Sequence, residues 1–193
     1  MSAIKTYRIN EIFYSLQGEG YYSGTPAVFV RFAGCNLQCG FCDTEFDAFE
    51  PMTAQDIVDA AMEYVVPAER ERSLLVLTGG EPSLQVDEPL IEALHRAGFF
   101  LAIETNGTRR LPMGVDWVTC SPKECTQIRC QHIDELKVVY LGQDVEQYYN
   151  SLRAEHYFLQ PCSCENSLET IAYIKSHPHW RLSLQTQKYL GIQ

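Results

Sequence analysis

The chain has 193 residues, 46% of them hydrophobic, and a formal net charge of −10, and this length is enough for one domain with its own core. The acidic balance argues against a nucleic acid or an anionic membrane as a partner, because both attract basic surfaces. No apolar run approaches the roughly 18 residues of a membrane span, and no apolar stretch of a signal peptide opens the chain. We therefore expect a cytoplasmic protein of one domain, residues 1–193.

Short apolar runs that end at polar or glycine residues predict the strands. The first run covers residues 27–32, and the run at residues 73–78 is apolar except at its ends. Runs of this kind are typical of parallel strands that are buried on both faces. Further strands are expected at residues 99–104, 117–121, 135–140, 157–160 and 181–185.

Between the strands, apolar residues recur at helical spacing. A helix is expected at residues 53–65, where Thr53 and Asp56 resemble a capping box. A second apolar stripe at residues 90–97 ends at Gly98. Residues 107–116 are too rich in Pro and Gly for a full helix. Helices are also expected at residues 145–154 and 167–175, the latter capped by Asn166 with Glu169.

Strands that alternate with helices predict an α/β fold, a parallel sheet covered by helices. A closed barrel of eight such units typically takes about 250 residues, so we expect an open, partial (β/α) barrel. Chemistry in such folds gathers at the carboxyl ends of the strands. Polar residues stand at or just after the predicted strand ends here: Arg31, Thr78, Glu81, Glu104, Asn106, Ser121, Lys123 and Gln160.

Three cysteines in one short segment are the strongest chemical signal in the chain. Cys35, Cys39 and Cys42 are spaced C-x3-C-x2-C, with the aromatic Phe41 before the last of them. Three thiolates hold a 4Fe–4S cluster with one iron left open for a small molecule, because a complete protein set has four ligands. The alternatives are a zinc loop or a group of structural thiols. A zinc site usually closes with four ligands, and the next His in the sequence is as far away as His95.

A Gly-Gly-Glu-Pro segment, residues 79–82, directly follows the predicted strand at residues 73–78. Two glycines let a ligand approach the backbone closely, and Glu81 adds a carboxylate at the same edge. A tight turn is the alternative for this segment alone. Together with the cysteines it resembles the element with which radical S-adenosylmethionine (SAM) enzymes hold the ammonium group of SAM. The resemblance implies a partial barrel of the radical SAM type, in which the reduced cluster splits SAM to a hydrogen-abstracting 5′-deoxyadenosyl radical.

The polar segment at residues 9–20 lies just before the cysteines and points to a narrower family. Gln17 and Glu19, with Arg31 in the strand that follows, would make a poor core but a good clamp for a polar substrate; the alternative is a glycine-punctuated turn. The whole arrangement closely resembles the 7-carboxy-7-deazaguanine synthase family (QueE) of deazapurine (queuosine) biosynthesis. Matching motifs span nearly the whole chain and include residues 42–44, 104–107, 121–123, 160–161 and 180–189.

The resemblance implies a reaction and a set of site residues. The family converts 6-carboxy-5,6,7,8-tetrahydropterin to 7-carboxy-7-deazaguanine by radical ring contraction with loss of ammonia, using SAM catalytically and Mg²⁺. Carried over, the three cysteines hold the cluster and Thr44 binds Mg²⁺. The pterin would contact Leu16, Gln17, Gly18, Arg31, Thr78 and the last residue, Gln193. SAM would contact Phe41, Cys42, Asp43, Gly80, Glu81, Ser121, Pro122, Lys123, Gln160, Pro161, Cys162 and Ser163.

Residue chemistry assigns tasks within this set. Arg31 is the natural two-pronged partner of the substrate carboxylate. Glu19 and Glu104 are the expected carboxylates for proton transfer and for the guanidine-like edge of the pterin. Gln187 stands where the family often carries His, and since an amide cannot titrate, it is a catalytic candidate by position only. Residues 186–193 are long enough to fold back over the barrel mouth; a frayed tail is the alternative.

The partners that the resemblance implies are a pterin substrate, an external electron donor such as flavodoxin or ferredoxin, and a second copy of the chain in a homodimer. Two other readings stay open at this point. One is a radical SAM activase that installs a glycyl radical on a protein, and the other is a non-catalytic iron–sulfur module. Five further thiols could hold a second cluster or be incidental: Cys120, Cys125, Cys130, Cys162 and Cys164.

Overall fold

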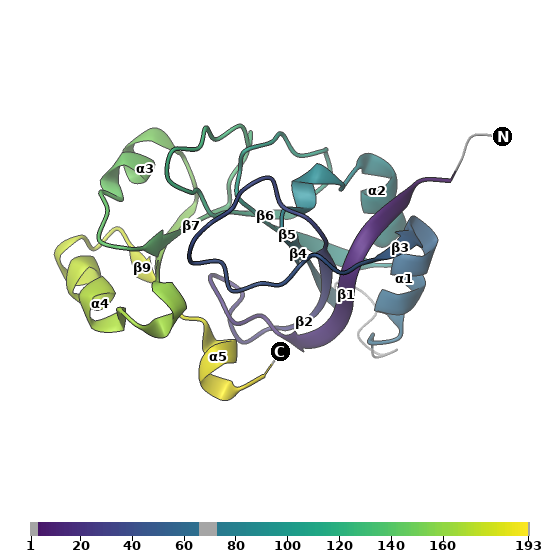
Figure 1. Ribbon diagram of the computed structural model, residues 1–193, viewed down its shortest axis with the longest axis horizontal. Coiled ribbons are helices and arrows are strands. Elements are labelled where there is room, and N and C mark those ends of the chain that lie inside the picture. Colours follow the sequence, from purple (N-terminus) through teal and green to yellow (C-terminus); the bar gives the residue numbers. More distant parts are fainter. Residues whose placement is uncertain (1–3, 66–72, 193) are drawn as a thin grey trace.

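The computed structural model describes residues 4–65 and 73–192, and within them the chain forms one nine-stranded sheet. The sheet curves around the centre of the molecule, with β3 and β9 at its two edges (Figure 1). Its order is β3-β1-β2-β4-β5-β6-β7-β8-β9. The strands are β1 Thr6–Leu16, β2 Pro26–Phe32, β3 Glu50–Thr53, β4 Ser73–Gly79, β5 Phe99–Thr105, β6 Trp117–Cys120, β7 Glu135–Tyr140, β8 His156–Pro161 and β9 Arg181–Leu182.

Helices α1 to α4 cover the outside of the curved sheet (Figure 1). The apolar faces of α1 and α2 pack against side chains such as Val30 and Leu75 on the outer face of the sheet. The predicted capping box is present, because Thr53 and Asp56 bond each other's backbone N–H groups. The helices are α1 Ala54–Met62, α2 Glu88–Arg96, α3 Glu146–Ser151, α4 Ser167–Ser176 and α5 Thr186–Leu190, with short 3-10 turns η2 Pro82–Leu84 and η3 Cys162–Cys164.

The expected open barrel is confirmed. From β2 to β9 every neighbouring pair of strands is parallel, as the continuous apolar runs predicted. The order of strands is linear rather than closed.

Two strands were missed because their side chains do not form apolar runs. β1 pairs antiparallel with β2 on one side and with β3 on the other. In β1 only Tyr7, Ile9 and Phe13 are buried, and polar residues interrupt them, so the segment looked like a turn. β3 has four residues and is largely exposed. Both strands extend the sheet beyond the parallel core.

Two local predictions were wrong. The last strand ends at Leu182 instead of residue 185, and only Ser183 N continues the ladder, to Leu159 O. Asn166 precedes α4 but does not cap it with its side chain. Its amide instead accepts from Cys162 N and donates to Tyr140 O, which ties the turn after β8 to the end of β7. Longer-range hydrogen bonds therefore replaced the expected local cap.

The inner face of the sheet has an apolar floor and a polar upper layer. Side chains on a strand alternate between faces, so Phe29 and Arg31 share the inner face of β2, as Val76 and Thr78 do on β4. Phe29 and Val76 belong to a buried apolar cluster. On β2, β4 and β5 the next inner position toward the carboxyl end is polar and holds Arg31, Thr78 and Glu104, and Lys137 is an inner polar residue of β7.

None of the described helices is both long enough and apolar enough to cross a membrane.

Candidate active site

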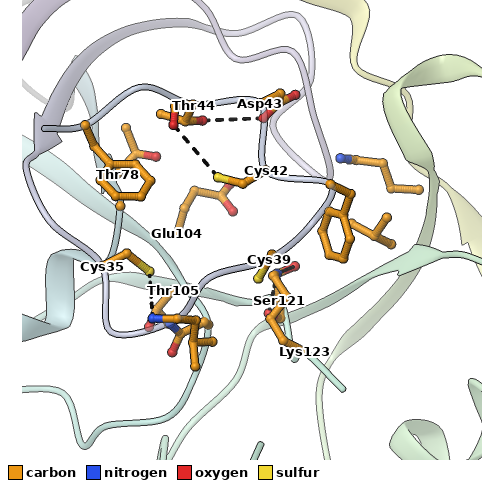
Figure 2. A pocket seen from close by; sticks show the side chains of 18 of the residues that line it. Cys35, Cys39, Cys42, Asp43, Thr44, Thr78, Glu104, Thr105, Ser121 and Lys123 are labelled. Carbon is orange, nitrogen blue, oxygen red and sulfur yellow. Dashed lines mark hydrogen bonds between the residues drawn. The ribbon is translucent and has the colours of Figure 1, made fainter. Parts of the chain in front are cut away.

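The cysteine loop, residues 33–49, leaves the carboxyl end of β2 and crosses the centre of the molecule (Figure 1). Gly34 N donates to Phe46 O at 3.1 Å, which closes the base of the loop. Cys42 N donates to Cys39 O at 3.1 Å, so the last two cysteines share one turn. All three thiols are free, and they surround one side of the cavity in Figure 2. Burial raises the pKa of the Cys35 thiol, which disfavours its charged form when no cation is near.

The two glycines after β4 pack against the start of this loop. Gly80 N donates to Phe32 O, and Glu81 N donates to Gly34 O at 2.9 Å. A Cβ added to Gly80 would lie 2.2 Å from Gly34 O, so no larger residue fits without moving the backbone. The glycines were predicted to admit a ligand. In this structure the group that approaches them is the backbone beside Cys35, so the segment fixes where the cysteines lie.

Glu81 does not face the cavity, contrary to the expectation from its place in the motif. Its side chain is 1% exposed. Oε1 accepts from Ser83 N and Thr105 Oγ1, and Oε2 accepts from Asn106 N at 2.7 Å. The carboxylate therefore joins the end of β4 to the end of β5. Any contact of this segment with SAM falls to its backbone.

A cavity of about 700 Å³ lies between the loop and the carboxyl ends of the strands (Figure 2), within the range of small-molecule sites. It gathers most of the residues predicted to hold the cluster, Mg²⁺ and SAM. Pro122 and Glu81 are not among its lining residues. The predicted residues that line it are Cys35, Cys39, Phe41, Cys42, Asp43, Thr44, Gly80, Ser121, Lys123, Gln160, Pro161, Cys162 and Ser163.

A smaller cavity of about 280 Å³ adjoins the first, since Asp43, Thr44, Thr78, Glu19 and Glu104 line both. Its lining includes every described residue predicted to contact the pterin: Leu16, Gln17, Gly18, Arg31 and Thr78. Gln193 lies outside the described residues.

Arg31 projects from β2 into the smaller cavity and is 20% exposed. Its Nε donates to Glu11 Oε1 at 2.6 Å. The two terminal Nη groups of the guanidinium make no hydrogen bond with the described residues, so they are available for another acceptor. The side chain also lies over the Phe13 ring, 5.6 Å from its centroid. Glu11 thus holds the Nε side of the guanidinium, and the side chain lines the smaller cavity.

Lys137 was not predicted, and it joins the two candidate carboxylates. Its Nζ donates to Glu19 Oε2 at 2.7 Å and to Glu104 Oε2 at 2.9 Å. Burial would lower the pKa of Lys137, but Glu104, Glu19 and Glu135 raise it above its usual range, so the ammonium stays charged. The sequence did carry a signal for it, because a lysine inside a buried strand requires a partner.

The carboxylates of Glu19 and Glu104 differ in their proton affinity. Burial alone would raise the pKa of Glu19, but the Lys137 ammonium and hydrogen bonds from Gln187 and Gln185 lower it to about 2. Burial raises the pKa of Glu104 to about 7, with Glu135 and Glu19 adding to the rise and Lys137 opposing it. Glu19 is therefore the stronger acid of the two, and Glu104 holds a proton more readily.

The segment after β9 forms the short helix α5, which lies at the lower edge of the molecule in Figure 1, beside the turn after β1. Thr186 N and Oγ1 both donate to Gly18 O. Lys188 forms an ion pair with Asp43 of the cysteine loop. Gln187 Nε2 donates to Glu19 Oε1 at 3.0 Å, while its buried Oε1 has no hydrogen-bond partner among the described residues. The expectation of a folded-back segment holds for residues 186–192, and the frayed tail is excluded for them.

Residues after β6 and β8 complete the rim. Lys123 Nζ donates to the backbone O and the Oγ of Ser121, both at 2.7 Å. Burial lowers the pKa of Lys123. Gln160 is 5% exposed, and its Oε1 accepts from Ser183 Oγ at 2.9 Å. These bonds fix the turns that face the cysteine loop across the cavity.

The donor set fits a cluster with one open iron. Three free thiols from one loop line a single cavity. Within residues 4–65 and 73–192, no three His, Cys, Asp or Glu side chains are arranged to hold a single metal ion. A 4Fe–4S cluster does not need that arrangement, because each thiolate binds a different iron. Of the other thiols, Cys120 is buried and Cys125 is exposed.

Comparisons with known proteins agree with this geometry. A family model described as the Radical SAM superfamily matches residues 29–177. A 7-carboxy-7-deazaguanine synthase of Bacteroides thetaiotaomicron is 55% identical, over 96% of this chain and 98% of that protein. One from Nitratidesulfovibrio vulgaris is 44% identical, over 97% and 99%. The crystal structure of QueE from Escherichia coli is similar, with a TM-score of 0.76, 28% identity and 93% of both chains covered.

Proposed function

Because this chain belongs to the radical SAM superfamily and, within it, to the 7-carboxy-7-deazaguanine synthases, we propose that it converts 6-carboxy-5,6,7,8-tetrahydropterin to 7-carboxy-7-deazaguanine with loss of ammonia. The alternatives of a glycyl-radical activase and a non-catalytic iron–sulfur module are not favoured, since relatives that match nearly the whole chain carry the synthase name. The reaction belongs to deazapurine (queuosine) biosynthesis.

One observation carries the proposal. Two adjoining cavities share Asp43, Thr44, Thr78, Glu19 and Glu104, and one of them is lined by three free cysteines while the other is lined by Arg31. A reactive cofactor on the loop and a carboxylated substrate on the inner wall would therefore meet at shared residues. Holding two reactants in fixed geometry accounts for a large part of enzymatic rate acceleration.

The cofactor side of the site uses the loop and the strand ends. When bound, the 4Fe–4S cluster and SAM supply one-electron chemistry and hydrogen abstraction from carbon. Cys35, Cys39 and Cys42 hold the cluster. The remaining task of the chain is to bind and orient SAM, through the loop residues Phe41 and Asp43, the backbone at Gly80, and the rim residues Ser121, Lys123, Gln160, Pro161, Cys162 and Ser163.

The substrate side uses the polar inner layer. Arg31 receives the pterin carboxylate, and Thr78 offers a hydroxyl next to it. Gln187 lines the smaller cavity and donates to Glu19, so it holds this carboxylate beside the substrate. Glu104 holds or releases the proton that the rearrangement moves. Gln187 has no acid–base role in this assignment.

The direct test is product analysis. Anaerobically reconstituted protein with the tetrahydropterin, SAM and a reductant should form 7-carboxy-7-deazaguanine, identified by mass spectrometry. Formation of 5′-deoxyadenosine without any deazaguanine product would mean that the chain is a radical SAM enzyme that acts on another substrate. An external one-electron donor such as flavodoxin or ferredoxin and a homodimeric state belong to the same proposal.

We expect Thr44→Ala to blunt the stimulation of turnover by Mg²⁺ and to leave the iron content unchanged. Thr44 lines both cavities, and its Oγ1 lies 3.4 Å from Asp43 Oδ1. Mg²⁺ prefers oxygen ligands and takes only one or two from protein while substrate supplies others. Turnover is measured against added Mg²⁺ in the parent, in Thr44→Ala and in Thr44→Ser, which keeps the hydroxyl. Equal stimulation of all three would remove Thr44 from the site.

A further inference from the structure

Lys137 is a buried cation that contacts both carboxylates of the site from the middle of β7. Its side chain is 6% exposed, and its ammonium bonds Glu19 at 2.7 Å and Glu104 at 2.9 Å. Glu19 comes from the loop after β1 and Glu104 from β5, so one side chain fixes the position of two groups that are far apart in sequence. A buried charge without a partner would be strongly destabilising, so the three charges are held together.

The two carboxylates share this ammonium but are bonded differently at their other oxygen. Glu19 Oε1 accepts from Gln185 Nε2 at 3.1 Å and from Gln187 Nε2 at 3.0 Å. Glu104 Oε1 has a single long contact among the described residues, with Gln17 Nε2 at 3.4 Å. Both carboxylates line both cavities, but Glu19 accepts more hydrogen bonds than Glu104. The hydrogen bonds therefore favour the charged form more strongly at Glu19 than at Glu104.

The charges that face Glu104 explain why its proton is sensitive to Lys137. Glu19 and the buried Glu135 add negative charge, and Lys137 is the cation bonded to it. Arg31 on β2 lines the smaller cavity with Glu104, and Lys123 after β6 faces Lys137. Of these cations only Lys137 is bonded to Glu104, while Glu19 and Glu135 act on it as like charges. Of the two carboxylates bonded to Lys137, Glu104 accepts fewer hydrogen bonds than Glu19, which favours a proton on Glu104.

We propose that Lys137 is a positioning residue that gives the two carboxylates different roles. It keeps Glu19 as an anion and positions Glu104 as the group that takes up and releases the proton. The proposal rests on the proposed function for its reaction but not for its measurement, because proton affinity can be followed without turnover. Lys137 itself lines both cavities, and in this role it acts through Glu104.

The experiment compares the titration of Glu104 in the parent, Lys137→Met, Lys137→Arg and Glu19→Gln. The carboxylic acid band is followed by infrared difference spectroscopy in reconstituted protein without substrate, and Glu104→Gln assigns it. Lys137→Met removes the nearby cation and should raise the midpoint by about one pH unit or more. Glu19→Gln removes a like charge and should lower the midpoint by about one unit. Lys137→Arg keeps the charge and should stay close to the parent.

The pH profile of turnover provides the second readout, with a midpoint that should move in the same directions. Lys175→Met, the same substitution at an exposed site on α4, should move neither. A role in folding alone would lower the amount of active protein without moving midpoints in opposite directions. Unchanged midpoints in Lys137→Met and Glu19→Gln would overturn the proposal. If Lys137→Met does not fold, an unshifted midpoint in Glu19→Gln overturns it by itself. Failure of the proposed function would appear separately, as loss of the deazaguanine product from the parent.

Discussion

Replacing Cys35, Cys39 or Cys42 with Ala is expected to abolish SAM cleavage and to lower the iron bound per chain. Each thiolate holds one iron, so removing one opens a second iron to solvent and weakens the cluster. Even partners one step removed from a metal ligand typically cost 10–100-fold, so the loss of a ligand should reduce cleavage by more than about 100-fold. Iron and sulfide analysis after anaerobic reconstitution, together with 5′-deoxyadenosine release, measures both effects.

Cys125→Ala is the matched control, because this thiol is exposed and lies outside the loop. The parent and this control should both hold about four irons per chain. About eight irons in the parent, falling to four in Cys125→Ala, would instead assign a second cluster to thiols such as Cys125, Cys130, Cys162 and Cys164. Normal SAM cleavage in any of the three loop variants would contradict the assignment of the cluster itself.

Most strands of the parallel core could be predicted because their sequences show a local apolar pattern. The segments that became β4 and β5 are short, mostly apolar and followed by polar or glycine residues, and burial on both faces produces that pattern. β1 could not be found in this way, since it places buried Tyr7 and Phe13 among polar residues. Its strand structure depends on pairing with both β2 and β3, which no local pattern reveals.

The same distinction between local patterns and long-range contacts separates the site residues that could be predicted from those that could not. The cysteines, the residues at strand ends and Arg31 could be predicted because each follows a local motif. Lys137 was missed because its importance lies in contacts with Glu19 and Glu104, more than thirty positions away in sequence. Glu81 shows the reverse: its motif is plain, but long-range bonds to Thr105 and Asn106 turn the carboxylate away from the cavity.

Arg31→Ala is expected to weaken binding of the carboxylated pterin by at least about 30-fold. Arg31 lines the smaller cavity and donates from Nε to Glu11, while its terminal Nη groups make no hydrogen bond with the described residues. Truncating one partner of a buried charge pair costs about 2–5 kcal/mol, and every 1.4 kcal/mol is tenfold in affinity. Arg31→Lys keeps the charge but loses the two-pronged geometry, so it should recover only part of the affinity.

The measurement that isolates Arg31 pairs these variants with a tetrahydropterin that lacks the carboxylate. Calorimetric binding without reductant avoids turnover. If Arg31 acts on the carboxylate, the parent should lose affinity for the shortened ligand, and Arg31→Ala should lose little more, because the interaction is already absent. Arg96→Ala, at an exposed arginine on α2, should bind both ligands like the parent. An Arg31→Ala variant that weakens both ligands equally would mean that Arg31 shapes the cavity through Glu11 and does not read the carboxylate.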